Sequence, residues 1–203
     1  MNTKKSATIA VCLTALLVFS PLAGFAQAAS SFSGEGVALK ANALGISLSA
    51  ADTGALPSSG GNLSTSLASV NVLGLASADL LKSTASGSGS SSQSESQAAD
   101  LNLLGGLITA KVVDSNSSAT CSGSTASTSG TAQIVNLMAA GQSIVVSNPN
   151  LALSLPGGIS LVVNEQTNST GGNSGSMTVN ALHVTGPGID IVVASAHSNI
   201  TCG

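Results

Sequence analysis

The segment Leu67–Gly87, LASVNVLGLASADLLKSTASG, decides the fold class of this 203-residue chain. Two apolar runs of strand length, LASVNVL and LASADLL, lie on either side of Gly74. A glycine between two such runs supplies the positive φ that a tight turn requires. The segment therefore predicts two antiparallel strands joined at Gly74, followed by a tail of small polar residues.

The same plan recurs along the chain as an internal repeat. Each copy has an asparagine among apolar residues, a glycine a few positions later, a β-branched run and a Ser/Thr/Ala tail. By subtraction of their residue numbers, the five asparagines are 29, 31, 34 and 44 residues apart: Asn42, Asn71, Asn102, Asn136 and Asn180. A repeat of this kind indicates that one supersecondary unit is used several times.

Successive hairpins predict an all-β fold. The abundance of Ser, Thr and Gly disfavours helices, because these residues compete for backbone hydrogen bonds or lose much backbone entropy. With about ten strands or more, an antiparallel sheet is expected to form a β-sandwich or to close into a barrel, which hides its edges. A β-solenoid with about thirty residues per coil is the alternative. The drifting repeat length favours the sandwich or barrel.

The composition restricts the interior of this fold. The chain has no Trp and no Tyr, and of its 3 Phe only Phe32 lies after residue 28. The core is therefore expected to consist of Val, Leu, Ile and Ala, with closely approaching sheets or a narrow interior. Two low-complexity segments, Ser83–Ser96 and Ser122–Thr131, lie between repeat copies. We interpret them as long hairpin ends or exposed edge strands, with disorder as the alternative.

Residues 1–28 have the three parts of a secretory signal peptide. Two lysines precede the apolar run Ala7–Phe19, and Ala26–Ala28 fits the small-x-small cleavage rule. The apolar run is too short to span a bilayer comfortably, and no later stretch is a membrane-helix candidate. An uncleaved N-terminal anchor is the alternative. Residues 29–203 are then expected to form a single extracellular all-β domain of ordinary size.

Two cysteines, Cys121 and Cys202, remain after the signal peptide. They end the tails of the third and fifth repeat copies, in the similar stretches SSATCSG and HSNITCG. In an exported protein, one disulfide between them is expected. A zinc site would need four ligands, and only His183 and His197 are present to complete one, so no metal site is predicted.

Charge is sparse and slightly negative. The chain has 5 Lys and Arg residues, two of them in the signal peptide, against 8 Asp and Glu residues, for a net charge of −3. Nucleic acid is excluded as a partner because almost nothing neutralises phosphates. A basic membrane-binding patch is excluded for the same reason. Envelope components or further copies of the chain are the partners that we expect.

Catalytic motifs are matched only in part. Asp52–Gly54 reads DTG, the tripeptide of aspartic proteases, but that chemistry needs two carboxylates and no second such motif is present. A turn capped by Asp52 is predicted instead. No G-x-S-x-G elbow marks a serine nucleophile, and His197 is interpreted as an exposed or hydrogen-bonded side chain. We therefore predict no catalytic residue and no cofactor, and expect the chain not to be an enzyme.

Binding motifs are also incomplete. The acidic residues are scattered singly, whereas calcium sites require clustered carboxylates. The polar stretch Asn164–Gly175 is interpreted as a loop, and the aromatic platforms of many carbohydrate-binding sites are absent. A site formed by Asp52, Glu165 and polar loops would bind a glycan or a metal. A metal site of His197 with Asp190 is a further alternative.

Several segments resemble the bacterial choice-of-anchor P family. They include NVLGLASADLLKSTASG, LNLLGGLITAKVVDSNSSATCSG and DIVVASAHSNITC, and the resemblance covers roughly Phe32–Cys202. The resemblance implies an exported or envelope-associated domain of unassigned function, with no catalytic residues to transfer. The sequence shows no sorting motif or hydrophobic tail after Cys202. We therefore expect release or non-covalent retention rather than covalent attachment to the cell wall.

Together these observations predict a secreted, non-enzymatic structural or adhesive protein of the cell surface. It is expected to act as a monomeric coat domain or to self-associate through edge strands. In the second case, the stretch SFSGEGVALKANALG, Ser31–Gly45, is the candidate to pair with a neighbouring molecule by strand addition. An extracellular ligand-binding module for glycan or metal is the second hypothesis. A hydrolase assembled from a serine, His197 and Asp190 is the third.

Overall fold

The computed structural model describes residues 30–43, 45–72 and 74–203. The predicted signal peptide lies outside the described residues, so it stays a prediction. The described residues form thirteen β-strands and one short 3₁₀ turn, η1. Their bounds are β1 Ser31–Ala43, β2 Ile46–Asp52, β3 Gly61–Val72, β4 Ala76–Ser88, β5 Ser91–Leu103, η1 Leu104–Gly106, β6 Ile108–Ser122, β7 Thr125–Val135, β8 Met138–Ala139, β9 Gln142–Ser143, β10 Leu151–Leu155, β11 Ile159–Gly171, β12 Ser174–Gly186 and β13 Ile189–Thr201.

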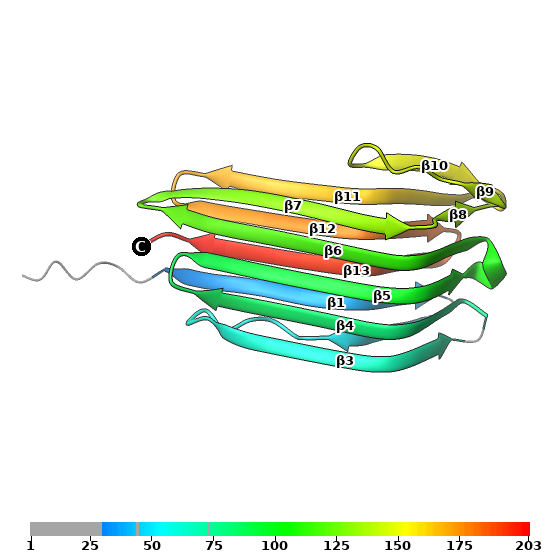
Figure 1. The fold of residues 1–203 in the computed structure, drawn as a ribbon, viewed down its shortest axis with the longest axis horizontal. Helices are drawn as coiled ribbons and strands as arrows, with labels where there is room; N and C mark the ends of the chain where they lie inside the picture. The colour runs from blue at the N-terminus through cyan, green and yellow to red at the C-terminus, as the bar shows by residue number, and fades with distance from the viewer. Residues whose placement is uncertain (1–29, 44, 73) are drawn as a thin grey trace, which may run out of the picture.

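The strands form two antiparallel sheets that pack face to face (Figure 1). Sheet A has six strands in the order β10-β11-β12-β13-β1-β2. Sheet B has seven strands, in which β3-β4-β5-β6 are followed by β7 along one part of β6 and by β8-β9 along another. The two sheets stay open, so the fold is a β-sandwich, and the barrel and solenoid alternatives are wrong. Within the described ranges, the structure holds no helix with the length and apolar character needed to span a bilayer.

The repeat marks one end of the sandwich, which we call the aliphatic end. Asn42, Asn71 and Asn102 are the next-to-last residues of β1, β3 and β5. The glycine three positions after each of them turns the chain, with φ of 82°, 70° and 66°. Asn136 directly follows β7, whereas Asn180 lies inside β12. The first three copies are therefore equivalent hairpins, and the fifth copy is equivalent in sequence only.

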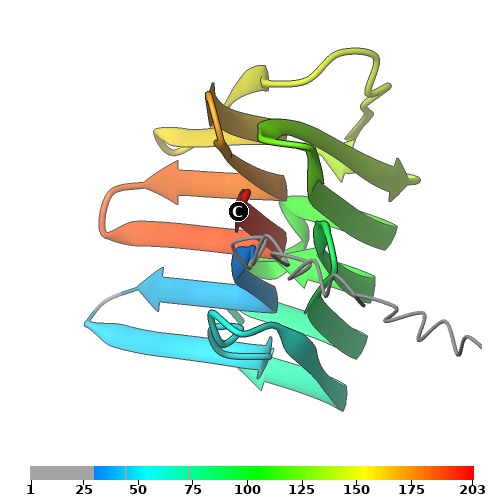
Figure 2. The same cartoon turned by 90° about the vertical axis from the view of Figure 1, so that its left-hand side faces the viewer.

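A crease crosses both sheets partway along the strands. From β2 to β11 across sheet A and from β3 to β6 across sheet B, the ladder between neighbouring strands is interrupted there. The skipped residues include Ala51, Ala38, Ala194, Ala181 and Asn164 in sheet A and Ala68, Leu80, Asp100 and Lys111 in sheet B. Five of them have positive φ, namely Ala51, Leu80, Asp100, Asn164 and Ala194. This conformation costs a non-glycine residue about 1–2 kcal/mol, and such irregularities bend strands. In Figure 2 the strands of both sheets bend together.

On the aliphatic side of the crease, the interior is filled by branched side chains. Sheet A contributes Leu39, Leu182 and Val193, and sheet B contributes Leu103 and Ile108, all of them fully buried. These residues alternate with outward-facing ones along each strand, as the period of a β-strand requires. This half therefore has the close-packed aliphatic core that the composition predicts.

On the other side of the crease, the interior is rich in serine, glycine and alanine, with Met177 and Val179 of β12 also buried there. Seven serines are buried here, namely Ser83, Ser92, Ser94, Ser96, Ser115, Ser117 and Ser198. The sheets lie so close that hydroxyls of sheet B reach the backbone of sheet A: Ser94 Oγ donates to the His197 carbonyl at 2.6 Å and Ser96 Oγ to the Ser195 carbonyl at 2.7 Å. A Cβ on Gly36 would lie 3.0 Å from the Glu95 carbonyl oxygen. The prediction of closely approaching sheets is confirmed for this half.

A predicted cysteine pair joins the two sheets at the disulfide end, opposite the aliphatic end. Cys121 is the next-to-last residue of β6 in sheet B, and Cys202 directly follows β13 of sheet A. The pair lies at disulfide distance, with 5.6 Å between the Cα atoms. A small apolar cluster surrounds it, formed by Phe32, Leu56, Ala119, Ala126 and Ile200. Phe32 and Leu56 pack here against Gly87, where a Cβ would lie 2.7 Å from the Phe32 ring.

The structure corrects two interpretations of the sequence. Asn164–Gly175 is not a loop, because it forms most of the paired ends of β11 and β12, with the turn at Gly172 and Asn173. The stretch Ser31–Gly45 is not an exposed edge, because β1 lies between β13 and β2. Its proposed pairing with a neighbouring molecule is therefore wrong. The low-complexity segments Ser83–Ser96 and Ser122–Thr131 form hairpin ends, as one of the two interpretations held.

Candidate functional site

The outer face of sheet A collects both histidines of the chain and four of its carboxylates. The inward positions of β1, β12 and β13 are apolar or small, so the alternate positions turn polar side chains to solvent. The strand register then sets Glu35 beside His197, and Lys40 beside Val192 and across from His183. The ionisable residues of this face are Glu35, Lys40, Asp52, Glu165, His183, Asp190 and His197.

His183 lies at the centre of a hydrogen-bonded group that we call the histidine trio, Glu165, His183 and Asp190. Its Nδ1 is 2.9 Å from Glu165 Oε2, and its Nε2 is 3.1 Å from Asp190 Oδ1. Asn180 Nδ2 donates to the same Glu165 oxygen at 2.7 Å. Only the doubly protonated imidazolium has a proton for both carboxylates. The trio therefore joins β11, β12 and β13 through polar contacts on an open face.

Glu35 and Asp52 form a carboxyl pair on the same face. Burial, the neighbouring charge of Asp52 and a hydrogen bond with Asp52 raise the pKa of Glu35. Burial also acts to raise the pKa of Asp52, but hydrogen bonds from Ser49, from the Gly54 backbone and from Glu35 outweigh it, so this pKa is lowered. Opposite shifts of this kind are typical of two carboxyl groups that share a proton.

The DTG turn is confirmed as a capped turn. Asp52 Oδ1 accepts from the Gly54 backbone at 2.8 Å, and Asp52 Oδ2 accepts from Ser49 Oγ at 2.7 Å. The second carboxylate that the sequence motif lacked comes from Glu35 on β1. The two acids lie on neighbouring strands of an open sheet face rather than between two lobes, as in an aspartic protease.

The carboxyl pair lines a hollow of ≈ 290 Å³ on the outer face of sheet A. The wall contains Lys40, Thr178, Asn180 and Ser195, and Val37 and Val192 form its apolar part. One cation, two carboxyls, an amide and two hydroxyls therefore surround a small volume. Such a hollow suits a small polar ligand that exchanges several hydrogen bonds.

His197 belongs to neither group. Its Nδ1 is 2.9 Å from Thr178 Oγ1. Burial lowers the pKa of His197, and a hydrogen bond with the Met177 backbone acts in the opposite direction. His197 and Asp190 lie on one strand seven residues apart, which corresponds to about 20 Å. The structure therefore does not bring together the metal pair or the hydrolase set built on these two residues.

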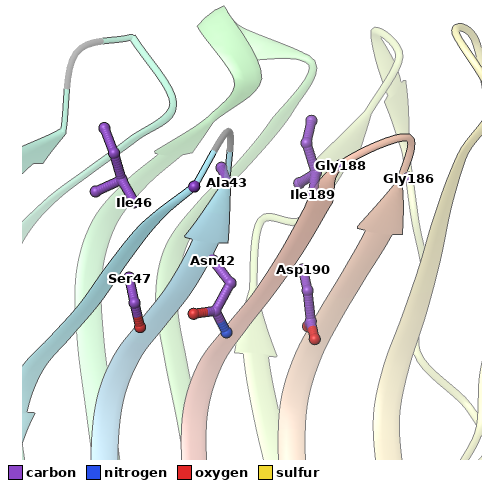
Figure 3. Close-up of a pocket in the computed structure, with 9 residues that line it drawn as sticks. Asn42, Ala43, Ile46, Ser47, Gly186, Gly188, Ile189 and Asp190 are labelled. Carbon is purple, nitrogen blue, oxygen red and sulfur yellow. The ribbon is translucent and has the colours of Figure 1, made fainter.

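A second hollow, of ≈ 480 Å³, lies at the aliphatic end between the β1–β2 and β12–β13 turns. Figure 3 shows Ser47, Asn42 and Asp190 extending side by side from β2, β1 and β13 toward it. The register places these residues in one cross-strand row that continues to Thr185. Asp190 therefore links this row to the histidine trio.

The arrangement supports hydrogen bonding to a polar partner more than it supports a reaction. Among the described residues, no group of three or more His, Cys, Asp or Glu side chains is placed to hold a metal ion. The sequence search missed the trio and the carboxyl pair, because both join strands whose pairing is not encoded locally. Of the two residues proposed for ligand binding, Asp52 lines the 290 Å³ hollow, and Glu165 contacts it through Asn180.

The function has to be inferred from the site, because comparisons with known proteins found no match. No protein-family model, curated protein or solved structure matches the chain. The resemblance to the choice-of-anchor P family accordingly stays an expectation from the sequence.

Proposed function

We propose that this protein is an exported, non-enzymatic structural or adhesive domain of the cell surface, able to self-associate through its sheet edges. The observation that carries the proposal is the outer face of sheet A, a broad open array of small polar side chains. Two of its cross-strand rows are Ser33, Asn199, Ser176 and Ser169, and Glu35, His197, Thr178 and Thr167.

Such a face suits contact with an extended polar surface. Neighbouring strands are about 4.8 Å apart and alternate residues along a strand about 7 Å apart, so the rows present hydroxyls and amides at regular spacing. Each contact to a polysaccharide-like surface is weak, and many of them acting together give useful affinity. The cysteine pair and the sequence resemblance fit an extracellular setting.

The proposal is tested by binding of the mature chain, residues 29–203, to isolated cell-envelope material and to hydrated polysaccharide beads. Ser176→Arg places a large charged side chain on the sheet A face near the disulfide end, in the row of Ser33, Asn199 and Ser169, and we expect it to lower retention about tenfold or more. Ser86→Arg on the outer face of sheet B is the matched control and is expected to bind like the wild type. A wild-type chain that is not retained, or equal effects of both substitutions, would contradict the proposal.

A ligand-binding module is the second candidate, because the hollow at Glu35 and Asp52 gathers opposite charges and hydrogen-bonding groups. A ligand that binds only the folded state raises the melting temperature. Thermal unfolding with calcium, zinc and a panel of soluble glycans tests this function. The expected result is a rise that Asp52→Asn removes, and no rise with any of them would dismiss this candidate.

A further inference from the structure

The β3 strand is an open edge of sheet B. It pairs with β4 along Gly61–Val72, and among the described residues no strand lies on its other side. In Figure 1 it forms the lowest strand of the front sheet. Most of its side chains are exposed. Its outer row of backbone N–H and C=O groups is therefore free to pair with another strand.

Proteins usually protect such edges with charges, prolines, bulges or covering segments. The β3 sequence GNLSTSLASVNV has 12 residues and contains neither a charged residue nor a proline. Two apolar side chains lie exposed near its middle, Leu67 with 41% and Leu80 of β4 with 53% of the surface accessible. This edge is therefore long, neutral and partly apolar, and the crease at Ala68 is the one irregularity along Gly61–Val72.

The other edges are shorter or already engaged. On sheet A, β2 has 7 residues and ends at Asp52, and β10 has 5 residues and is followed by Pro156. On sheet B, β7 is also uncharged, but its Ala126 amide donates to the Gly172 carbonyl of sheet A at 3.1 Å. Along its length β7 also packs against β11 and β12. The β3 edge is the one best suited to a partner.

We propose that β3 pairs with β3 of a second copy of this chain, antiparallel, around a two-fold axis at the middle of the strand. Strands β3 to β7 alternate in direction, so a translated copy would bring β7 alongside β3 in parallel. A two-fold axis instead continues the antiparallel pattern of the sheet, and two-fold dimers are the commonest oligomers. A strand that faces itself sets any charge against the same charge, and β3 has none.

The size of this edge predicts a weak dimer. A strand of 12 residues is roughly 40 Å long, and pairing two copies forms about twelve backbone hydrogen bonds. With sheets about 10 Å apart, each copy would bury on the order of 400 Å², at the low end of specific interfaces. A dissociation constant on the order of micromolar or weaker follows. The dimer then forms where copies are concentrated, as on a crowded surface.

The test is sedimentation velocity of the mature chain from about 1 to 500 µM, a range that brackets this affinity. Ser66 is exposed at the middle of β3, opposite Lys82 of β4. Within one copy, the carboxylate introduced by Ser66→Glu faces Lys82 of β4. Across the two-fold axis, it faces the same carboxylate of the second copy, and like charges in that position repel. We expect a concentration-dependent dimer for the wild type and for the control Ser86→Glu, and a monomer for Ser66→Glu. Circular dichroism checks that all three chains are folded.

Hydrogen exchange gives an independent readout. On dimerisation the β3 amides are expected to exchange at least tenfold more slowly, whereas those of β7 stay unchanged. A wild type that stays monomeric, or a dimer that Ser66→Glu leaves intact, would overturn the inference. The inference deepens the self-association in the proposed function, and the adhesion assay with Ser176→Arg reports on that function separately. A wild-type chain that stays monomeric but still binds envelope material would contradict only the β3 pairing, not the adhesive function.

Discussion

The two halves of this sandwich build their interiors in different ways from the same strands. On the aliphatic side of the crease, branched side chains such as Leu39 and Leu182 fill the space between the sheets. On the disulfide side, glycine and serine let the sheets approach until Ser94 and Ser96 hydrogen-bond the opposite backbone. The difference teaches that a change of side-chain size along each strand can alter how two sheets are held together.

The magnitudes explain where the cysteine pair lies. A fully buried Leu or Val contributes about 1.5–3 kcal/mol relative to an exposed one. A buried serine hydroxyl with a good partner contributes about 0.5–1.5 kcal/mol net and is costly when it has none. The serine half therefore has less hydrophobic stabilisation, and the pair of Cys121 and Cys202 lies at its outer end. The disulfide expected from this pair would offset the weaker packing there.

The largest expected effect comes from removing that link. Cys121→Ala combined with Cys202→Ala should lower the free energy of unfolding by about 4–5 kcal/mol, because the closed loop spans 81 residues. Urea unfolding followed by far-UV circular dichroism measures this, since the chain has no Trp or Tyr to report by fluorescence. A loss below about 1 kcal/mol, or free thiols in the exported wild type, would contradict the staple.

The next effect distinguishes the halves by opposite changes in volume. Leu39→Ala on the aliphatic side should cost about 2–5 kcal/mol, because it leaves a cavity. Gly36→Ala on the serine side removes nothing, yet its added Cβ would lie 3.0 Å from the Glu95 carbonyl and from Ser83 and Ser96. It should cost about 1–3 kcal/mol by overpacking. If Gly36→Ala stabilises the fold, the sheets are not in close contact there.

A smaller effect tests the serine layer itself. Ser96→Ala removes the bond to the Ser195 carbonyl and the 3.0 Å hydrogen bond with the buried Ser83 hydroxyl, and should cost about 1–2 kcal/mol. Ser115 lies in the same row and is fully buried, but its hydroxyl has no hydrogen-bond partner among the residues that the structure describes. Ser115→Ala should therefore be neutral or stabilise the fold by up to about 1 kcal/mol. Equal losses for the two substitutions would show that bonding does not distinguish these serines.

The smallest expected effect concerns pH at the boundary of the serine half. Burial lowers the pKa of His197 below its ordinary value of 6.5. The unfolded chain then binds the proton first, so the contribution of His197 to stability is present above pH 6.5 and is lost as the pH falls through the folded pKa. His197→Gln should flatten the loss of stability in that window. An NMR titration of the His197 ring that gives a pKa of 6.5 or higher would contradict this.

Much of the fold could be predicted from local features of the sequence. Gly74 between two apolar runs gave the β3–β4 hairpin, and the lack of aromatic residues pointed to close sheets. The pairing of Cys121 with Cys202 followed from their being the two cysteines outside the predicted signal peptide. Turns and alternation act over a few residues, so they are visible in the chain itself.

The features that could not be predicted from the sequence all depend on contacts between distant segments. β1 pairs with β13 across more than a hundred residues, so no local pattern shows that the N-terminal strand is internal. Asn164–Gly175 looks like a loop because it is polar, yet its pairing with β12 and β13 continues the sheet. The histidine trio needs three strands in one register, and a single-residue slip would turn His183 inward.

The crease has a consequence for how this protein tolerates changes in length. The positions skipped at the crease line up from strand to strand. Deleting one residue on either side of the crease in a single strand would therefore misalign that strand with both of its neighbours. We therefore expect insertions and deletions to be tolerated only in the segments beyond the strand ends. The segment between β7 and β11 fits this rule. It lies within the largest spacing between repeat asparagines, from Asn136 to Asn180, whereas β11 and β12 each have 13 residues, as β1 does.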